Sequence, residues 1–324
     1  MNPLSIVILA AGLGKRMKSK IPKVLHPLCG KPLIYYVLNT AKSLAAERVI
    51  LVIGHGKESI RELINDNDIE FVEQYPPIGT GDAVLRTEAT LKDFNGNVLI
   101  LSGDVPLLKK DTMEELLKVH NKEKAKATIL TVELKNPKSY GRIVRKGNEV
   151  VKIVEYRDAN SWEKEIKEIN TGIYVFDKNA LFEALKEIRP DNVQKEYYLT
   201  DTIGIIKEKG GHIAAYRTSD PEEVAGINTR KELTEIEKIL QSKIIEKHEL
   251  AGVTIKDPAS TRIDADVRIG RDTVIYPYTS ILGNTVIGEC CSIGPNTVII
   301  DSKIGDNSRV GEFTRIEGAH LGQK

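Results

Sequence analysis

The sequence predicts an α/β protein in two parts: a mainly parallel sheet covered by helices over residues 1–228, and a β-helix over residues 251–324. In the first part, short β-branched runs alternate with helical patterns, as in proteins whose sheet is buried on both faces. In the last part, aliphatic residues recur every six positions. Residues 229–250 have helical periodicity without glycine or proline and predict one linking helix.

Composition excludes several classes of protein. The chain has 47 lysine and arginine residues against 46 aspartate and glutamate residues, so its net charge of +1 provides no bulk field for nucleic acid or anionic membranes. No apolar run approaches the roughly 20 residues of a membrane span, and Leu4–Ala11 is too short for a signal peptide. Cys29, Cys290 and Cys291 have no metal-site spacing, and they predict a reducing, cytoplasmic location.

Within residues 1–228, strands and helices are predicted in alternation. The predicted strands are Ser5–Leu9, Val49–Ile53, Glu70–Val72, Val98–Leu101 and Ala127–Val132. The predicted helices are Lys31–Ala46, Lys57–Ile64, Gly81–Leu91 and Lys110–Asn121. Ligands of such sheets bind outside the carboxyl ends of the strands, which is where the loop Gly12–Gly14 would lie.

The loop Gly12–Gly14 belongs to the stretch ILAAGLGKRMKSKIPK, in which cations follow an apolar run. It is not a dinucleotide fingerprint, because Met17 replaces the third glycine and no acidic residue closes the next strand. The Walker pattern is also absent. The loop can still turn its amide groups toward a phosphate chain, with Lys15, Arg16 and Lys23 nearby. Taken alone, these cations are equally consistent with a solvated surface.

The last part reads as hexads: IDADVR, IGRDTV, IYPYTS, ILGNTV, IGECCS, IGPNTV, the five-residue IIDSK, IGDNSR, VGEFTR and IEGAHL. Isoleucine or valine opens every unit, and glycine follows it in five of the ten. This period predicts about three coils of a β-helix, with the aliphatic residues in the shared core. A run of β-hairpins would require alternating patterning instead.

Seven motifs together resemble one family. The opening AAGLGKRMKS-x-IPKVLHPLCGKPL resembles that of the sugar nucleotidyltransferases. Six more follow in the family's order: Gln74 with GTG, then LSGDVPL, YGRI, IVEYRDA, EINTGIY and GINTR. With the hexad tail, they resemble the bifunctional N-acetylglucosamine-1-phosphate uridylyltransferases and glucosamine-1-phosphate acetyltransferases. The resemblance implies a Rossmann-like nucleotidyltransferase domain, a left-handed β-helix, a homotrimer and a place in peptidoglycan synthesis.

The resemblance also implies a reaction and its residues. The reaction is Mg²⁺-dependent uridylyl transfer from UTP to N-acetylglucosamine 1-phosphate, giving UDP-N-acetylglucosamine and pyrophosphate. The implied catalytic residues are Arg16, Lys23 and Asp104, and the implied metal ligands are Asp104 and Asn228. The implied nucleotide-binding residues are Leu9, Ala10, Ala11, Gly12, Gly14, Lys15, Gln74, Gly79 and Thr80. The implied sugar-binding residues are Gly103, Gly141, Glu155, Asn170, Thr171 and Tyr174. Without the resemblance, Asp104 reads as a turn residue and Glu155 as a surface strand residue.

Departures from the family pattern lie near the base site. Pro76-Pro77 stands where the family often has a second glutamine, and Asp82 occupies a usual histidine position. Selectivity for the base and the sugar therefore stays open, and another nucleotide or sugar 1-phosphate is the nearest alternative. A non-catalytic assembly or regulatory paralogue is a further alternative, although the fold itself requires none of the trio Lys23, Asp104 and Asn228.

The acetyltransferase reaction is not expected from this chain. The family's acetyltransferase motif has no counterpart here, and His320 is the only histidine in the hexads. The repeat stops at Gly322–Lys324. The sequence leaves open whether it is a shortened form or a naturally short protein whose acetylation another chain performs.

Overall fold

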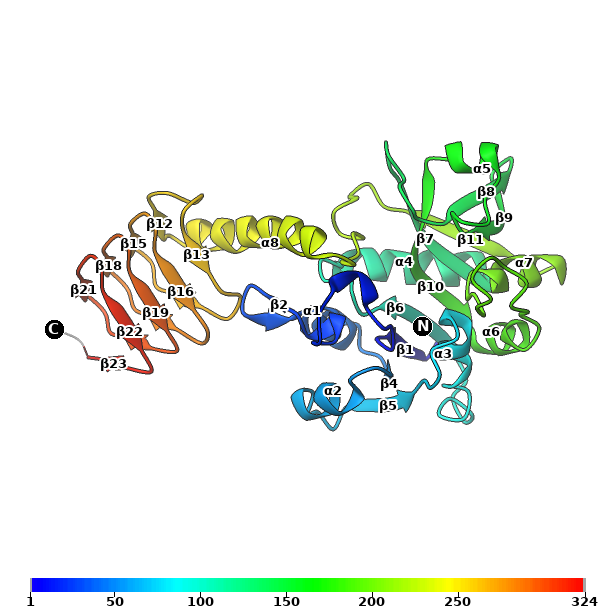
Figure 1. Ribbon diagram of the computed structural model, residues 1–324, viewed down its shortest axis with the longest axis horizontal. Helices are drawn as coiled ribbons and strands as arrows, with labels where there is room; N and C mark the ends of the chain where they lie inside the picture. The colour runs from blue at the N-terminus through cyan, green and yellow to red at the C-terminus, as the bar shows by residue number, and fades with distance from the viewer. Residues whose placement is uncertain (1, 323–324) are drawn as a thin grey trace. The chain divides into compact units, whose positions relative to one another are not determined.

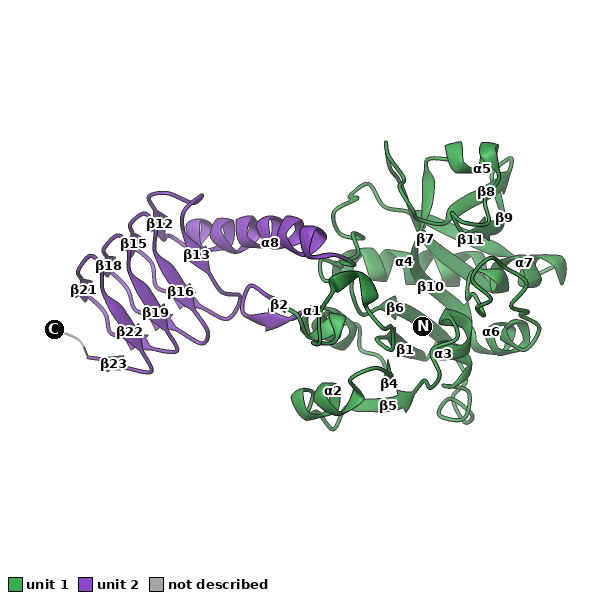
Figure 2. Ribbon diagram, in the orientation of Figure 1, with its two compact units in different colours: residues 1–26, 33–228 green, residues 27–32, 229–324 purple. Residues whose placement is uncertain are grey.

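The computed structural model describes residues 2–322, which form two compact units (Figure 2). The first unit contains the residues up to His26 together with Leu33–Asn228. The second contains Pro27–Pro32 and the chain from Thr229 onward. Among the described residues, no helix has both the length and the apolar character that crossing a bilayer requires.

The first unit is built on a nine-stranded sheet whose main path runs β11-β7-β10-β6-β1-β4-β5 (Figure 1). These strands are β1 (Leu4–Leu9), β4 (Arg48–Ile53), β5 (Ile69–Glu73), β6 (Asn97–Ser102), β7 (Ala127–Glu133), β10 (Glu168–Asp177) and β11 (Ile213–Arg217). All neighbours on the path are parallel except β10, which is antiparallel to both β6 and β7. A hairpin of β8 (Arg142–Lys146) and β9 (Glu149–Val154) joins β10. The predicted mainly parallel sheet is confirmed.

Helices cover both faces of this sheet. They are α1 (Leu33–Lys42), α2 (Lys57–Leu63), α3 (Thr80–Leu85), α4 (Lys110–Glu123), α5 (Ser161–Glu165), α6 (Lys178–Leu185) and α7 (Asp201–Glu208), with the short 3₁₀ turns η1 (Lys15–Met17) and η2 (Lys23–Leu25). Successive residues of β1 enter different cores: Ile6 and Ile8 belong to one apolar cluster and Val7 to the other. A strand buried on both faces has no polar alternation, which is why its sequence reads as a continuous apolar run.

Two predicted helices differ from the structure. The first begins at Leu33, because Lys31 and Pro32 form strand β3, which pairs with β2 (Pro27–Leu28). A residue before proline is disfavoured in the α region, so Lys31 is extended. The helix predicted to reach Leu91 ends at Leu85, and several of the following amides bond three residues back, as in Thr87 N–H to Val84 O at 2.9 Å. Such bonds tighten the chain into turns.

The second unit contains α8 (Arg230–Leu250) and three four-stranded parallel sheets, ordered β12-β15-β18-β21, β13-β16-β19-β22 and β14-β17-β20-β23. Their strands are β12 (Thr254–Ile255), β13 (Arg262–Ile263), β14 (Arg268–Ile269), β15 (Val274–Ile275), β16 (Ser280–Leu282), β17 (Val286–Ile287), β18 (Ser292–Ile293), β19 (Val298–Ile300), β20 (Lys303–Ile304), β21 (Arg309–Val310), β22 (Arg315–Glu317) and β23 (His320–Leu321). Each coil contributes one strand to each sheet, as in a short left-handed β-helix (Figure 1). The prediction of a hexapeptide β-helix is confirmed.

The hexad residues explain this stacking. The opening aliphatic residues are buried in one core, from Ile263 onward. The fifth position is a buried threonine in four of the ten units, and it can bond the next coil, as when Thr273 Oγ1 donates to Gly288 O at 2.8 Å. Cys291 occupies the same position, and its Sγ contacts Gly305 O at 3.2 Å. Strand β12 was not predicted, because eight residues instead of six separate Ile255 from Ile263.

Candidate functional site

The carboxyl ends of β1 and β6 meet at the same edge of the sheet, because the two central strands are parallel neighbours. Gly103, directly after β6, donates its N–H to Leu9 O at 2.9 Å. A methyl group at Gly103 would lie 3.0 Å from that carbonyl oxygen, so a larger residue would require the two strand ends to move apart by a few tenths of an ångström. The predicted residues Leu9 and Gly103 therefore form the floor from which the flanking loops rise.

The loop after β1 leaves a row of backbone amides available. Ala10 and Ala11 are buried, and Ala10 N–H bonds to Val52 O at 2.8 Å, which fixes the start of the loop. The N–H groups of residues 12–15 have no acceptor within the described part of the chain. Gly14 has φ +56°, and a methyl group there would lie 3.0 Å from Lys23 Cβ. The loop thus offers unpaired donors to an anion beside Lys23.

Three cations surround this loop. Lys15 and Arg16 are exposed, and neither has an ion-pair partner within residues 2–322. Lys23 differs, because its ammonium forms an ion pair with Asp104 and donates to Asn228 Oδ1 at 3.1 Å. The side chains of Lys23 and Asp104 are only 16% and 17% exposed. The structure therefore brings together the predicted residues Lys23, Asp104 and Asn228.

The donor chemistry around Lys23 fits a divalent cation. The Asp104 carboxylate and the Asn228 amide oxygen converge on one ammonium, so both oxygens already face a cation. Ile227 N–H bonds to Asp104 O at 3.0 Å, which holds the end of the unit beside β6. No group of three or more His, Cys, Asp or Glu side chains that could hold a metal occurs among the described residues. Mg²⁺ does not need such a group, because it takes one or two protein oxygens together with phosphate oxygens and water.

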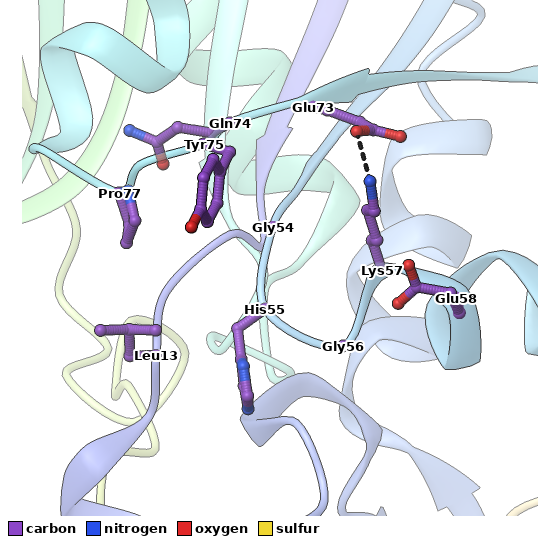
Figure 3. A pocket seen from close by; sticks show the side chains of 10 residues that line it. All are labelled: Leu13, Gly54, His55, Gly56, Lys57, Glu58, Glu73, Gln74, Tyr75 and Pro77. Carbon is purple, nitrogen blue, oxygen red and sulfur yellow. Dashed lines mark hydrogen bonds and ion pairs between the residues drawn. The ribbon is translucent and has the colours of Figure 1, made fainter.

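A pocket opens beside the same loop (Figure 3). Its lining residues are Leu13, Gly54, His55, Gly56, Lys57, Glu58, Glu73, Gln74, Tyr75 and Pro77. Gln74 is buried, and its Nε2 donates to Gly79 O at 2.8 Å and to Asp82 Oδ2 at 2.9 Å. Both amide hydrogens of Gln74 are thereby engaged. The pocket has an apolar wall of Leu13 and Pro77 on one side and a polar edge at Gln74.

Gly79 and Thr80 hold the loop that leads into α3. Gly79 has φ +127°, and a methyl group there would lie 2.4 Å from Tyr197 O. Thr80 Oγ1 accepts the Leu199 N–H at 3.0 Å, so its side chain fastens a neighbouring loop. The conformation and the crowding both require glycine at residue 79.

Three predicted sugar-binding residues lie together near the start of β10. A methyl group at Gly141 would lie 3.4 Å from Glu155 Oε2 and 3.5 Å from Asn170 Cβ. Asn170 N–H also bonds to Gly141 O at 2.9 Å. Burial raises the pKa of the Glu155 carboxyl, and the charges of Asp201 and Asp158 add to this effect, whereas a hydrogen bond from Thr200 opposes it. Glycine leaves space at this point for a ligand to approach a carboxylate and an amide.

Thr171 and Tyr174 support Asn170 from inside the protein. The register of β10 against β7 shifts between Asn170 and Tyr174, and Thr171 Oγ1 donates to Leu130 O at 2.7 Å within this irregular segment. Tyr174 is buried beside Phe176, with ring centroids 5.6 Å apart. Its hydroxyl is hydrogen-bonded to the Asn170 side chain, and burial strongly raises its pKa.

Sequence reasoning missed three residues of this region. Thr200 Oγ1 donates to Glu155 Oε1 at 3.3 Å, and burial raises the pKa of the neighbouring Asp201 to about 6. Arg142 is 1% exposed and donates to Tyr140 O and, at 3.0 Å, to Lys138 O, which fixes the loop before Gly141. The available signals were weak: Thr200-Asp201 reads as a helix start, and a lone arginine in a strand reads as exposed.

Comparison with known proteins agrees with the two-part architecture. Residues 6–230 match the MobA-like NTP transferase domain family, and residues 266–301 match the bacterial transferase hexapeptide family with six repeats. Similar curated proteins are each called bifunctional protein GlmU. Those of Caldanaerobacter subterraneus subsp. tengcongensis and Geobacillus sp. strain WCH70 are both 50% identical, over 96% and 94% of this chain. That of Halalkalibacterium halodurans is 44% identical over 98% of the chain. The chain spans 67%, 66% and 70% of their lengths, about two thirds.

Among solved structures, a UDP-glucose pyrophosphorylase complexed with UDP-glucose has a similar fold. The TM-score is 0.61 at 20% sequence identity, and the match covers 74% of this chain and 99% of that one. At this identity the likeness concerns the fold alone.

Proposed function

This chain belongs to the GlmU family, in which an NTP transferase domain is followed by hexapeptide repeats, and on that premise we propose that it joins UTP and N-acetylglucosamine 1-phosphate. The products are UDP-N-acetylglucosamine, a precursor for peptidoglycan, and pyrophosphate. The observation that carries the proposal is the convergence of Lys23, Asp104 and Asn228 beside a loop of unpaired amides. Such an arrangement suits a triphosphate that is cleaved, because it combines phosphate donors with oxygen ligands for a cation.

The reaction needs no nucleophile from the protein. A phosphate oxygen of the sugar phosphate attacks the α-phosphorus of UTP, a new O–P bond forms, and the bond to the bridging oxygen of the β-phosphate breaks. Pyrophosphate leaves in line with the attack. The attacking phosphate is already ionised near neutral pH, so it needs no general base. The work of the protein is to position two anions and to offset their charge.

The residues around the loop Gly12–Gly14 would contact different phosphates of UTP. The amides of residues 12–15 would bind the phosphate chain, with Lys15 and Arg16 at the leaving β- and γ-phosphates. Lys23 would leave its ion pair with Asp104 and donate to the α-phosphate. Loss of one such preorganised donor costs on the order of 10²–10³ in rate.

A divalent ion belongs to this activity in the family, and we propose that Mg²⁺ fills the role. Asp104 and Asn228 would hold it, and when bound it would offset negative charge on the phosphates. With Asp104 and Asn228 engaged in this way, Lys23 would be free to donate to the nucleotide.

The sugar would bind against Gly141, Glu155 and Asn170. A carboxylate accepts hydrogen bonds from sugar hydroxyls, and an amide side chain can both donate and accept. The space over Gly141 is bounded by these two side chains at 3.4 and 3.5 Å from an added methyl group, so the residues form one surface. Thr171 and Tyr174 would act by holding Asn170.

We also propose that the protein is cytoplasmic and forms a homotrimer through the β-helix. Three free cysteines fit a reducing compartment, and the matched hexapeptide repeats belong to a family of transferases. For the 324-residue chain itself, the absence of acetyl transfer stays a prediction.

The proposed reaction is tested with UTP labelled at one phosphorus atom, by measuring which product carries the label. UTP labelled at the α-phosphorus should place its label in the nucleotide sugar, and UTP labelled at the γ-phosphorus should place it in pyrophosphate. The Asp104→Ala variant should lose most turnover at unchanged thermal stability. Release of labelled inorganic phosphate from γ-labelled UTP, or near-normal turnover by Asp104→Ala, would overturn the assignment.

A further inference from the structure

We propose that Asp82, held by Arg86, fixes the amide of Gln74 in one orientation and thereby makes the base site reject cytosine. The inference rests on the proposed function, because it takes the pocket beside the phosphate loop as the site of the nucleotide base. It assigns a positioning role to a residue that departs from the family pattern.

The hydrogen bonds determine which end of the amide faces the ligand. Gln74 Nε2 donates one hydrogen to Gly79 O at 2.8 Å and the other to Asp82 Oδ2 at 2.9 Å. Both partners are acceptors only, so neither could bond the amide oxygen if the group were reversed. Figure 3 shows the oxygen of Gln74 turned toward the pocket interior beside Tyr75 and Pro77, with the nitrogen pointing away from it.

Arg86 holds Asp82 in place. Its Nε donates to the same Oδ2 atom at 2.9 Å, one turn later along the chain. The carboxylate of Asp82 is 14% exposed, so solvent competes weakly for this oxygen. Reversal of the Gln74 amide would place two acceptors against each other at both Gly79 and Asp82, and buried groups left without partners are costly.

The fixed orientation presents an acceptor to the base. Uracil carries a hydrogen on N3, which can donate to Gln74 Oε1, whereas N3 of cytosine carries a lone pair and would face that oxygen without a bond. The exocyclic group also differs, since cytosine has an amino donor where uracil has a carbonyl acceptor. The Gly79 N–H has no partner among the described residues and can donate to a carbonyl of uracil. The site therefore distinguishes the bases by the proton on N3.

The test compares direct binding of UTP and CTP in the presence of Mg²⁺, by isothermal titration calorimetry, on the full chain. We expect the parent protein to bind UTP at least about 10-fold more tightly than CTP. Asp82→Ala removes one of the two acceptors that hold the Gln74 amide and leaves only Gly79 O against its reversal. It should reduce the preference for UTP over CTP at least about fivefold, mainly by improving CTP binding relative to UTP. Thermal denaturation of each variant reports whether the fold is intact.

Two further variants separate orientation from general disturbance. Asp82→Asn keeps an oxygen for Arg86 and Gln74, so its preference should stay within about threefold of the parent. Glu88→Ala removes a nearby carboxylate that pairs with Lys186 at 2.5 Å and does not contact Gln74, and its preference should be unchanged. The proposal would be overturned if Asp82→Ala preferred UTP over CTP as strongly as the parent does. It would also be overturned if the parent bound UTP and CTP equally well. UTP-selective binding without any turnover would instead refute the proposed reaction and leave this inference standing.

Discussion

Replacement of Lys23 by methionine should change turnover and metal binding in opposite directions. In the structure the Lys23 ammonium lies between the Asp104 carboxylate and Asn228 Oδ1, which are the two oxygens that a divalent ion would use. The ammonium would therefore compete with such an ion for these two oxygens. Methionine keeps most of the side-chain stem, which begins at the Cβ atom facing Gly14, and removes only the charge.

The size of each effect follows from the exposure of the pair. The two side chains are 16% and 17% exposed, so displacing the ammonium should cost about 1–2 kcal/mol, between the values for surface pairs and for buried pairs. Without that competitor, Lys23→Met should bind Mn²⁺, a probe for the site, about 5- to 30-fold more tightly in the absence of nucleotide. Turnover should nevertheless fall by about 10²–10³, because a preorganised donor to the α-phosphate is lost.

Electron paramagnetic resonance of free Mn²⁺ measures the first quantity, and pyrophosphate release measures the second. Lys20→Met is the control, because Lys20 is exposed and has no ion-pair partner in the described part of the chain. A damaged fold would weaken both metal binding and turnover. Unchanged or weaker Mn²⁺ binding by Lys23→Met, with turnover lost, would refute the role of Lys23 as a competitor for the metal site.

Three further changes test other parts of the account. Burial raises the pKa of Asp201 to about 6, so ionisation of this carboxyl destabilises the fold as pH rises. The Asp201→Asn variant should therefore have a higher melting temperature than the parent above pH 6 but not below pH 4. An equal difference in melting temperature at both pH values would contradict this. Gly79→Ala should destabilise the protein by about 1–3 kcal/mol in urea and weaken UTP binding, because its methyl group would lie 2.4 Å from Tyr197 O at φ +127°. Cys291→Thr should stay within about 1 kcal/mol of the parent in urea, because threonine fills the same position in neighbouring coils, and a loss above about 2 kcal/mol would oppose that view.

The parts of the fold that the sequence predicts are those with a regular period. The hexads indicate the β-helix, because each aliphatic residue enters the same core. The continuous apolar runs indicate a sheet buried on both faces. The period fails between Ile255 and Ile263, where eight positions replace six, so strand β12 was missed although the rest of the first coil was predicted. The boundary of α1 was missed for a local reason, the proline at residue 32.

The site was predictable only where motifs mark the ends of strands. Lys23 lies 81 residues from Asp104 and 205 from Asn228, and no local pattern shows that they meet. The resemblance to a family supplied that grouping, and the sheet topology gives its physical cause, since parallel neighbours end at one edge. Thr200 lies 45 residues from Glu155, and the contact depends on tertiary packing that no spacing encodes.

Pyrophosphate release across a matrix of nucleoside triphosphates and sugar 1-phosphates, with and without Mg²⁺, tests the central claim most directly. The account predicts a single maximum at UTP with N-acetylglucosamine 1-phosphate, and little release for any pair when Mg²⁺ is withheld. A maximum at another pair would show that the base or sugar is assigned wrongly. No release from any pair would contradict the claim that Lys23, Asp104 and Asn228 form the centre of a nucleotidyltransferase.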